Sequence, residues 1–261
     1  MAEVVRTATG EGVAVITLAR PEKLNAVTAE VHAQLRPALD AAEKDATVRC
    51  VVLTGAGRAF SSGQDLTEDL RGADGKLDLG TALDRDYNPL VERLYHFPKV
   101  TLAALNGPAV GASLNIALAC DIVVAARSAY LQEAFARIAL VPDAGGTWLL
   151  PRIVGSKRAL ALMLTADQVS AEDAERVGLV YKVFDDATFT ADTMALARRL
   201  AAGPAAAYRM IKQAARASGG NDLTTQLALE RDLQCEAGRG RDFIEGVMAF
   251  REKPAAKFEG R

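Results

Sequence analysis

Asp143 is the residue of this 261-residue chain whose setting most suggests chemistry. It stands between Pro142 and Ala144-Gly145-Gly146, a lone carboxylate among small and apolar residues where the pattern predicts a helix start. Apolar surroundings disfavour the charged form of a carboxyl group and raise its pKa toward neutrality, which suits it to moving protons. The same carboxylate could instead cap a helix over Gly145 and Gly146. On the residues alone, both interpretations stay open.

Small residues upstream of Asp143 can present backbone amides to a ligand. Residues Val100–Leu105 are typical of a short buried strand, which Asn106-Gly107 ends. Gly111-Ala112-Ser113 then opens a second apolar run, and the first amides of a helix that starts there have no partners within the helix. Such amides stabilise the negative oxygen of an enolate, by about 3 to 4 kcal/mol per donor. Together with a carboxylate, they favour proton transfer next to a thioester or ketone carbonyl.

Other kinds of site lack support in the sequence. The two histidines, His32 and His96, are isolated, and no cysteine pair has metal-ligand spacing, so we expect no metal site. A serine-hydrolase elbow and the glycine spacings of nucleotide loops are also missing. A formal net charge of -2 argues against nucleic acid as a partner.

The composition also indicates where the protein works. Cys50, Cys120 and Cys235 are odd in number and widely spaced, which suits reduced thiols that pack in the interior. The N-terminus does not resemble a signal peptide, and no apolar run approaches the roughly 20 residues of a membrane span. We therefore expect a soluble, cytoplasmic protein with no membrane partner.

The elements that must position Asp143 alternate between strands and helices. Buried strands are predicted over Val13–Leu18 and Val100–Leu105 and over residues 50–53, 121–125 and 129–132. One helix is predicted to start at an N-cap Thr28 and to kink or break at Pro37; another covers residues 89–97. The polar stretch 67–87 is a candidate mobile flap over a site. This alternation predicts an α/β fold built from stacked units.

The chain changes character after Gly155 and becomes helical. Helices are predicted over residues 159–164, 171–177, 190–202, 204–217, 223–235 and 242–250. This alanine-rich tail has more apolar surface than one subunit needs, which indicates packing on neighbouring subunits. We divide the chain into a core that carries the site, residues 1–200, and a helical oligomerisation region, residues 201–261.

Several motifs together resemble the enoyl-CoA hydratase/isomerase, or crotonase, superfamily. The resemblance covers nearly the whole chain and is carried by Arg20-Pro-Glu-Lys-Leu-Asn-Ala26, Gly57-Arg-Ala-Phe-Ser-Ser-Gly-Gln-Asp-Leu66, Asn106-Gly-Pro-Ala-Val-Gly-Ala-Ser113, Ala119-Cys-Asp121 and Gly145-Gly-Thr-Trp-Leu-Leu-Pro-Arg152. It implies a crotonase-like spiral of ββα units followed by helices that trimerise, so the expected assembly is a homotrimer or homohexamer. It also implies an acyl-CoA thioester as substrate and no separate cofactor, because coenzyme A is part of that substrate.

The resemblance assigns roles to individual residues. The oxyanion-hole amides would belong to Gln64 and Ala112. The segment that wraps the adenine and pantetheine of coenzyme A would include Lys23, Leu24 and Ala26. The remaining assignments are residues lining the same groove, Ser62, Asp65 and Leu66, and residues reaching the nucleotide from a neighbouring subunit, Phe250 and Lys253.

Departures from the hydratase pattern bear on the reaction. Hydratases hold the attacking water with two glutamates, and the matching positions here are Asn115 and Phe135, which argues against water addition. Asp143 matches a position where family members place an acidic group for isomerisation or nucleophilic chemistry, with Asn115 as a candidate orienting partner. The combination of Asn115, Asp143 and residues 147–152 most resembles the isomerases of phenylacetate degradation, which turn ring-1,2-epoxyphenylacetyl-CoA into oxepin-CoA and shift double bonds in unsaturated acyl-CoAs.

Three alternatives stay open at this stage. The first is a Δ3,Δ2-enoyl-CoA isomerase of fatty-acid oxidation that uses the same Asp143. The second, from a different class, is a non-catalytic subunit that binds CoA thioesters. The third is a dehalogenase-like nucleophilic role for Asp143, for which no histidine is placed to activate the hydrolytic water.

Overall fold

A six-stranded sheet in the order β1-β2-β3-β4-β6-β9 forms the centre of the computed structural model, which describes residues 2–68, 71, 75, 77–252 and 256–260. Its strands are β1 (Val5–Gly10), β2 (Val13–Leu18), β3 (Cys50–Gly55), β4 (Val100–Leu105), β6 (Ile122–Ala126) and β9 (Lys182–Phe184). β1 and β2 form an antiparallel hairpin, and the other neighbours pair in parallel. A smaller sheet contains β5 (Ala109–Val110), β7 (Tyr130–Gln132) and β8 (Val169–Ser170).

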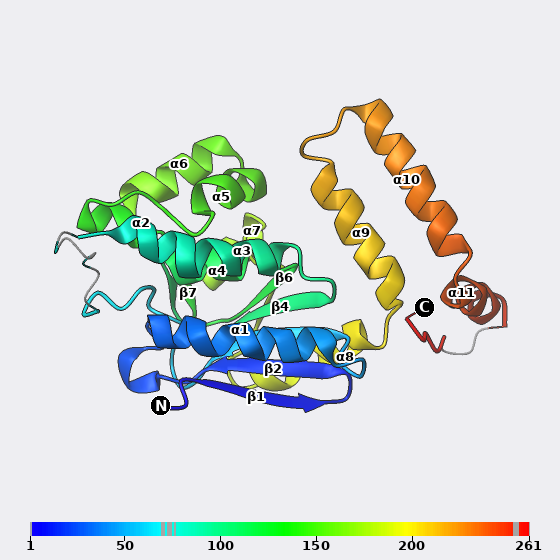
Figure 1. Cartoon of the computed structure of the whole chain (residues 1–261), viewed down its shortest axis with the longest axis horizontal. Helices are drawn as coiled ribbons and strands as arrows, with labels where there is room; N and C mark the ends of the chain where they lie inside the picture. The colour runs from blue at the N-terminus through cyan, green and yellow to red at the C-terminus, as the bar shows by residue number, and fades with distance from the viewer. Residues whose placement is uncertain (1, 69–70, 72–74, 76, 253–255, 261) are drawn as a thin grey trace.

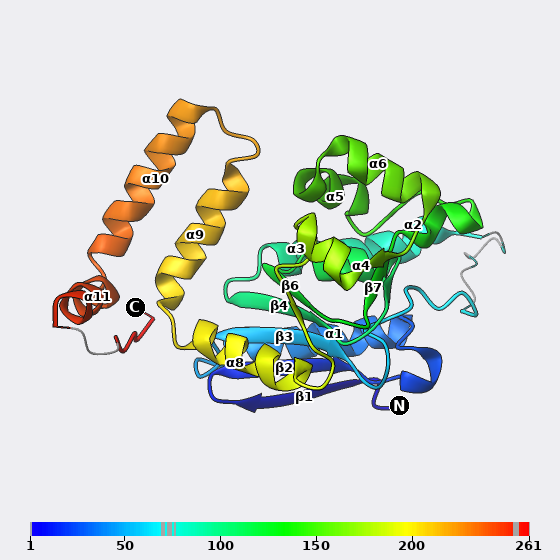
Figure 2. The same ribbon diagram turned by 180° about the vertical axis from the view of Figure 1, so that it is seen from behind.

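The two faces of the large sheet are both buried, which explains the continuous apolar runs of its central strands. Val51 and Leu53 of β3 face the core cluster that includes residues of α1 (Ala29–Lys44), α3 (Asn88–Tyr95) and α4 (Ala112–Leu118). Cys50 and Val52 face the opposite cluster, which is closed by α8 (Phe189–Ala201). Figures 1 and 2 show α1 and α8 on either side of the sheet. The predicted α/β fold is confirmed.

The helix after Thr28 shows one correct and one wrong prediction. Thr28 is the N-cap, and its hydroxyl oxygen accepts a hydrogen bond from Val31 N at 3.3 Å. The predicted kink or break at Pro37 is wrong, because α1 continues to Lys44. Pro37 is exposed while Leu35 and Leu39 are buried. The carbonyl that loses its partner therefore lies on the solvent side, and packing of the apolar face holds the helix together.

The remaining short elements connect the sheet to the site. They are η1 (Pro21–Lys23), α2 (Leu79–Ala82), the π-helical turn η2 (Leu83–Tyr87), η3 (Ala134–Ile138), α5 (Gly146–Val154), α6 (Ser156–Thr165) and α7 (Ala171–Arg176). The predicted flap, residues 67–87, falls partly outside the described residues, and its described end is helical, with Tyr87 buried. The hairpin strand β1 was not predicted, because five of its six residues are exposed. The short strands β8 and β9 were also missed within the region predicted to be helical.

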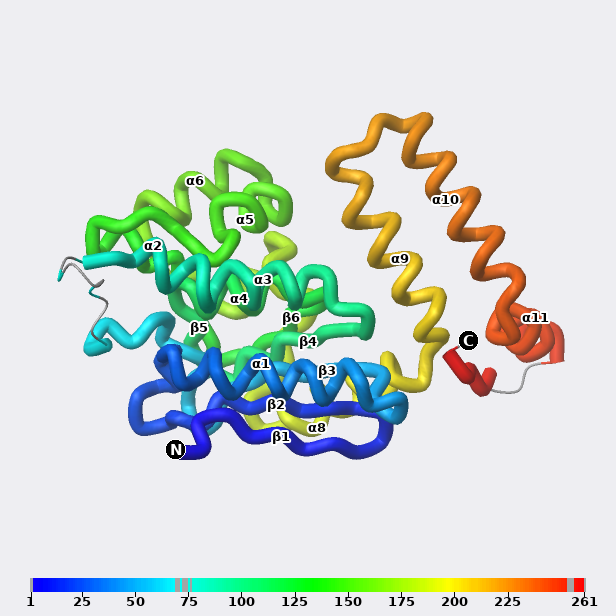
Figure 3. Tube along the Cα trace, in the orientation of Figure 1, coloured from blue at the N-terminus to red at the C-terminus, as the bar shows by residue number. Residues whose placement is uncertain are grey.

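The C-terminal helices form an arm, here defined as α9 (Ala205–Ala217), α10 (Leu223–Gly238) and α11 (Arg241–Glu252), that extends away from the sheet (Figures 1 and 3). The second half of α9 is anchored to the core, because Lys212 and Arg216 form ion pairs with Asp121, each at 2.6 Å. Pro204 is the N-cap of α9 and not its first helical residue. Large apolar side chains of the arm are exposed in the single chain: Ile211, Leu223, Leu227, Phe243, Ile244, Met248 and Phe250. Among the described residues, no helix combines the length and apolar character needed to cross a bilayer.

Candidate active site

The loop that carries Gln64 is held by backbone hydrogen bonds to the segment after η1. Val27 N donates to Gly63 O at 2.8 Å, and Asp65 N donates to Val27 O at 2.9 Å. Ser62 N donates to Leu24 O at 3.0 Å. The segment 23–26, which the sequence assigns to coenzyme A, therefore lies directly beside the loop 61–65 that is predicted to supply an oxyanion amide. Lys23 is exposed in this arrangement, and Ala26 is buried.

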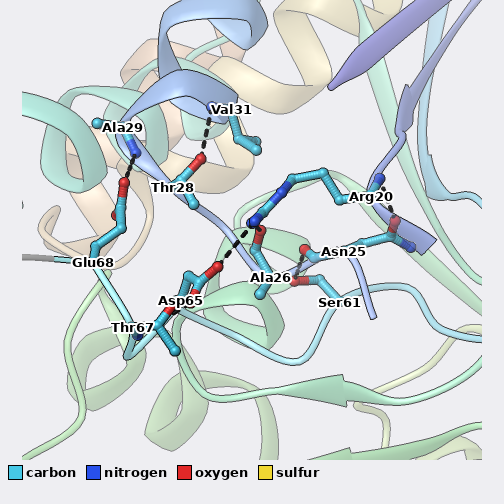
Figure 4. Close-up of polar contacts among 10 residues, drawn as sticks. All are labelled: Arg20, Asn25, Ala26, Thr28, Ala29, Val31, Ser61, Asp65, Thr67 and Glu68. Carbon is cyan, nitrogen blue, oxygen red and sulfur yellow. Dashed lines mark hydrogen bonds and ion pairs between the residues drawn. The ribbon is translucent and has the colours of Figure 1, made fainter. Parts of the chain in front are cut away.

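Arg20 and Asp65 tie the same loop together, as Figure 4 shows. Arg20 Nη2 lies 3.0 Å from Asp65 Oδ2, and Arg20 Nη1 donates to Ala26 O at 2.5 Å. The other carboxylate oxygen of Asp65 accepts from the amide and hydroxyl of Thr67, at 3.1 and 2.6 Å. The Thr67 hydroxyl, helped by Arg20, holds the pKa of Asp65 below its usual value in spite of burial. The position of Asp65 on the CoA groove stays a prediction, and its carboxylate binds Arg20 and Thr67 and holds the loop.

We expect Asp65→Asn to lower both stability and turnover. The substitution leaves Arg20, whose side chain is 17% exposed, without its counter-charge. Breaking such a pair costs about 3 kcal/mol and loosens the loop that carries Gln64, so kcat should fall about tenfold. Thermal melting and steady-state kinetics would measure both effects. Asp45→Asn is the matched control, because Asp45 accepts the same two bonds from Thr47 without a buried cation. Equal behaviour of the two variants would contradict this role.

The second predicted oxyanion amide, that of Ala112, stands at the start of α4. Gly111 is the N-cap with φ 57° and no side-chain cap, so the chain turns sharply into the helix and leaves the Ala112 amide without an intrahelical acceptor. Within the described chain, neither this amide nor that of Gln64 donates to another protein atom. Both residues line one cavity of about 270 Å³ together with Asp143. The cavity wall also includes Ser62 and Leu66, which were predicted to line the CoA groove, and Phe135 at a hydratase glutamate position. Arg137, Ile138 and Leu140 line it as well and were not predicted.

Asp143 has the environment of a proton carrier. Its side chain is half-buried, and its Oδ1 atom is buried with no hydrogen-bond partner in the described chain. Burial raises the pKa of its carboxyl group to about 6. The capping alternative is wrong, because the N-cap of α5 is Gly145, with φ 81°, and no side chain caps that helix. Only the main-chain carbonyl of Asp143 serves the turn, by accepting from Gly146 N at 2.9 Å.

Asn115 fixes the chain at Asp143. It is completely buried on α4, and its Nδ2 donates to the main-chain oxygen of Asp143 at 2.9 Å. The amide therefore orients the backbone of Asp143, not its carboxylate. Phe135, at the other position where hydratases carry a glutamate, is buried and lines the cavity. Neither position offers a carboxylate that could hold an attacking water.

Two buried polar residues near Asp143 were missed in the sequence. Glu133 is 3% exposed, and burial together with the charge of Asp143 raises the pKa of its carboxyl group to about 7. The Tyr87 hydroxyl is buried with no hydrogen-bond partner among the described residues. Its pKa is raised mainly by burial and, to a smaller extent, by the negative charge of Asp143. A single acid directly after a buried strand was the available signal for Glu133. Tyr87 had no such signal, because it closes a polar stretch.

The structure does not bring every predicted site residue together. Phe250 lies on α11 of the arm and is 89% exposed, and its contact with the nucleotide of a neighbouring subunit stays a prediction. Lys253 lies outside the described residues. In the part of the chain that is described, no group of three His, Cys, Asp or Glu side chains could hold a metal ion. The cavity wall thus combines one carboxylate, Asp143, with two residues whose backbone amides have no acceptor in the described chain, a combination suited to forming and holding an enolate.

The chain is similar to known proteins over its whole length. The sequence pattern of the family described as enoyl-CoA hydratase/isomerase matches residues 8–261. The chain is 47% identical to 1,2-epoxyphenylacetyl-CoA isomerase of Escherichia coli K12 over 100% of both chains. It is 34% identical to trans-2-decenoyl-acyl-carrier-protein isomerase of Streptococcus mutans, over 96% of this chain and 95% of the other. The crystal structure of enoyl-CoA hydratase from Bacillus anthracis superposes with a TM-score of 0.90 at 30% identity, covering 99% and 100% of the two chains.

Proposed function

Because the chain belongs to the enoyl-CoA hydratase/isomerase family, we propose that it isomerises ring-1,2-epoxyphenylacetyl-CoA to oxepin-CoA in phenylacetate degradation, and that it also shifts double bonds in unsaturated acyl-CoAs. The observation that carries the proposal is Asp143, a half-buried carboxylate beside two free amides, in a cavity that lacks both hydratase glutamates. The proposed reaction needs no metal or redox cofactor, since coenzyme A is part of the substrate. We place it in the cytoplasm.

The proposed mechanism moves one proton between two carbons. The thioester oxygen accepts hydrogen bonds from the amides of Gln64 and Ala112, which favours loss of a proton from the neighbouring carbon or from the γ-position. Asp143 takes that proton and returns it to a different carbon, so no atoms are gained or lost. In the epoxide substrate, the same carboxylate assists ring expansion. Asn115 holds the backbone of Asp143 in place through both steps.

A turnover assay over a panel of acyl-CoAs tests the proposal. Ring-1,2-epoxyphenylacetyl-CoA should give the highest kcat/KM, a straight-chain 3-enoyl-CoA should be isomerised more slowly, and a 2-enoyl-CoA should not be hydrated. Rapid hydration would contradict the assignment. The assay with 2-enoyl-CoA also tests the effect of the missing hydratase glutamates, since Asn115 and Phe135 at those positions carry no carboxylate to position water.

A Δ3,Δ2-enoyl-CoA isomerase is the second candidate. It is favoured by the aliphatic side chains on the cavity wall, Leu66, Ile138 and Leu140, and by the isomerase activity in the name of the Streptococcus mutans relative. A preference for the 3-enoyl substrate in the panel would select this candidate. The Asp143 environment opposes a non-catalytic CoA-binding subunit, because a half-buried carboxylate with one oxygen buried and unpaired costs stability.

We further propose that the protein assembles as a homotrimer or homohexamer through the arm. The exposed apolar side chains of α9, α10 and α11 would be covered by neighbouring subunits. Light scattering should give three or six times the chain mass of 27.6 kDa. Leu227→Glu, which puts a charge on this apolar surface, should shift the distribution toward smaller species, whereas the neighbouring Arg231→Glu should not. A monomer at micromolar concentration would contradict the proposal.

A further inference from the structure

Arg216, in the last turn of α9, contacts the core at two points. Its Nη2 atom lies 2.6 Å from Asp121 Oδ1. Its Cζ atom lies over the Tyr95 ring, 4.4 Å from the ring centre. The side chain is 16% exposed, so its charge is largely removed from water and is held by a carboxylate and an aromatic face. Both partners belong to the core, so this side chain joins the arm to it.

The contact with Asp121 connects Arg216 to α4. Asp121 comes shortly after the end of α4, and its carboxylate also accepts a hydrogen bond from Thr101 N on β4, at 2.8 Å. The opposite end of α4 begins with Ala112, the residue with the free amide, and the same helix carries Asn115, which binds the main chain of the proposed base. The arm therefore restrains the far end of the helix on which two groups of the site depend.

Tyr95, the last residue of α3, connects the same contact to α5. Its ring centre lies 5.4 Å from that of Trp148, and the two planes meet at 86°, a favourable edge-to-face arrangement. Trp148 lies in the first turn of α5, and its amide donates to Gly145 O at 3.0 Å. Val91, one helical turn before Tyr95, packs so closely on Gly145 that a Cβ there would lie 3.3 Å from Val91 Cγ1. α3 thus contacts both the first turn of α5 and the turn before it.

Burial alone does not fix Trp148. The side chain is 44% exposed and borders a cavity of about 590 Å³, whose wall also includes Tyr95 and Asp121. Arg152 lies over the indole with its Cζ atom 3.9 Å from the ring centre, but it belongs to α5 itself. It therefore cannot fix α5 relative to the other helices. Tyr95 supplies that contact from a different element.

We propose that Arg216 is a positioning residue for the proton transfer: by holding Asp121 and Tyr95 together, it fixes the spacing of α4 and α5. Because α4 begins with Ala112 and α5 follows Asp143, this spacing sets the distance between the oxyanion amide and the base. The inference rests on the proposed function, since it assumes that Asp143 is the base. Arg216 is not on the wall of the cavity that contains Asp143, and it acts through the two helices.

Arg216→Met tests the role from the arm. Methionine has neither the charge nor the planar group, so kcat should fall about tenfold with KM within about twofold, because reacting groups are displaced and binding surfaces are kept. Lys212 stays paired with Asp121 at 2.6 Å, so the carboxylate keeps a counter-charge and the variant should fold. Arg209→Met is the matched control, because Arg209 lies on the same helix but pairs with Glu236 of α10, inside the arm. The control should keep the wild-type kcat.

Substitutions of Tyr95 test the same connection from the core. Tyr95→Leu removes the ring and should also lower kcat about tenfold at nearly constant KM, whereas Tyr95→Phe keeps the ring and should keep the rate. Because Arg216 and Tyr95 act through one contact, a variant with both Arg216→Met and Tyr95→Leu should be no slower than the slower single variant. Independent effects would instead multiply to about a hundredfold. A general loss of stability would produce neither the rescue nor this non-additivity.

Thermal melting and light scattering separate positioning from loss of fold or assembly. Rates are compared at a temperature where every variant is folded. Tyr95→Leu carries the test if Arg216→Met changes the assembly, because Tyr95 lies outside the arm.

The outcomes separate this inference from the proposed function. Wild-type kcat in Tyr95→Leu, an equal loss in Arg209→Met, or multiplied effects in the double variant would overturn the role of Arg216 even where Asp143 proves essential. Full activity after removal of the Asp143 carboxylate would overturn the proposed function instead. A tenfold loss in both single variants, with rescue by phenylalanine and no further loss in the double variant, would support the positioning role.

Discussion

Asp143→Asn should lower kcat by on the order of a hundredfold or more while the affinity for coenzyme A stays nearly unchanged. Asparagine keeps the shape of the side chain and the main-chain carbonyl that Asn115 and Gly146 bind, and it removes only the base. Turnover of the preferred acyl-CoA and calorimetric titration with coenzyme A would measure the two quantities. In the wild type, kcat/KM should rise with pH through about 6, where the carboxyl group loses its proton.

Stability distinguishes loss of chemistry from loss of fold in this variant. The folded-state pKa of Asp143 is raised, so its contribution to stability is present below about pH 3.8 and is lost as pH rises through about 6. At neutral pH the wild type therefore bears the cost of a half-buried charge, and Asp143→Asn should melt at the same temperature or higher. The exposed Asp167→Asn is the matched control. Wild-type turnover in Asp143→Asn would place the catalytic base elsewhere.

The parts of the fold that were predictable are those that local pattern determines. The strands β2, β3 and β4 are short apolar runs ended by glycine, asparagine or proline, and the structure has them within two residues of the prediction. The helix start at Thr28 follows from capping chemistry alone. Pro37 shows the limit of such arguments, because packing of Leu35 and Leu39, which no local pattern measures, outweighs the missing backbone donor.

The candidate site divides in the same way. Asp143 was recognisable because it is a lone carboxylate among small and apolar residues. Ala112 was recognisable because it lies among small residues where a helix is predicted to start. Asp65 was assigned to the CoA groove by the resemblance alone, and the sequence did not show that Arg20, 45 residues away in the chain, binds its carboxylate. Glu133 was overlooked although it directly follows a predicted buried strand, because a position after a strand does not by itself show whether a side chain is buried. In the folded chain it is 3% exposed, and its carboxyl oxygens have no hydrogen-bond partner among the described residues.

Gly146 has an equally non-local reason to be glycine, and Gly146→Ala should impair both folding and catalysis. A Cβ at this position would lie 2.3 Å from Nδ2 of Asn115 and 2.7 Å from its Cγ. Asn115 is completely buried, so its amide has no free space to move into. We expect a loss of about 2 kcal/mol in the free energy of unfolding, which lowers Tm by roughly 5 °C.

The catalytic effect of Gly146→Ala should exceed what this loss of stability explains. Displacing the Asn115 amide breaks its hydrogen bond to the Asp143 carbonyl and shifts the base relative to the amides of Gln64 and Ala112. A displacement of about 1 Å costs on the order of a hundredfold in rate, so kcat should fall by that factor at temperatures where the variant is fully folded. Gly238→Ala is the control, because a Cβ there meets no atom within 4 Å. If Gly146→Ala melts lower but turns over substrate like the control, the hydrogen bond from Asn115 does not position Asp143, and the amide serves only to fill the core.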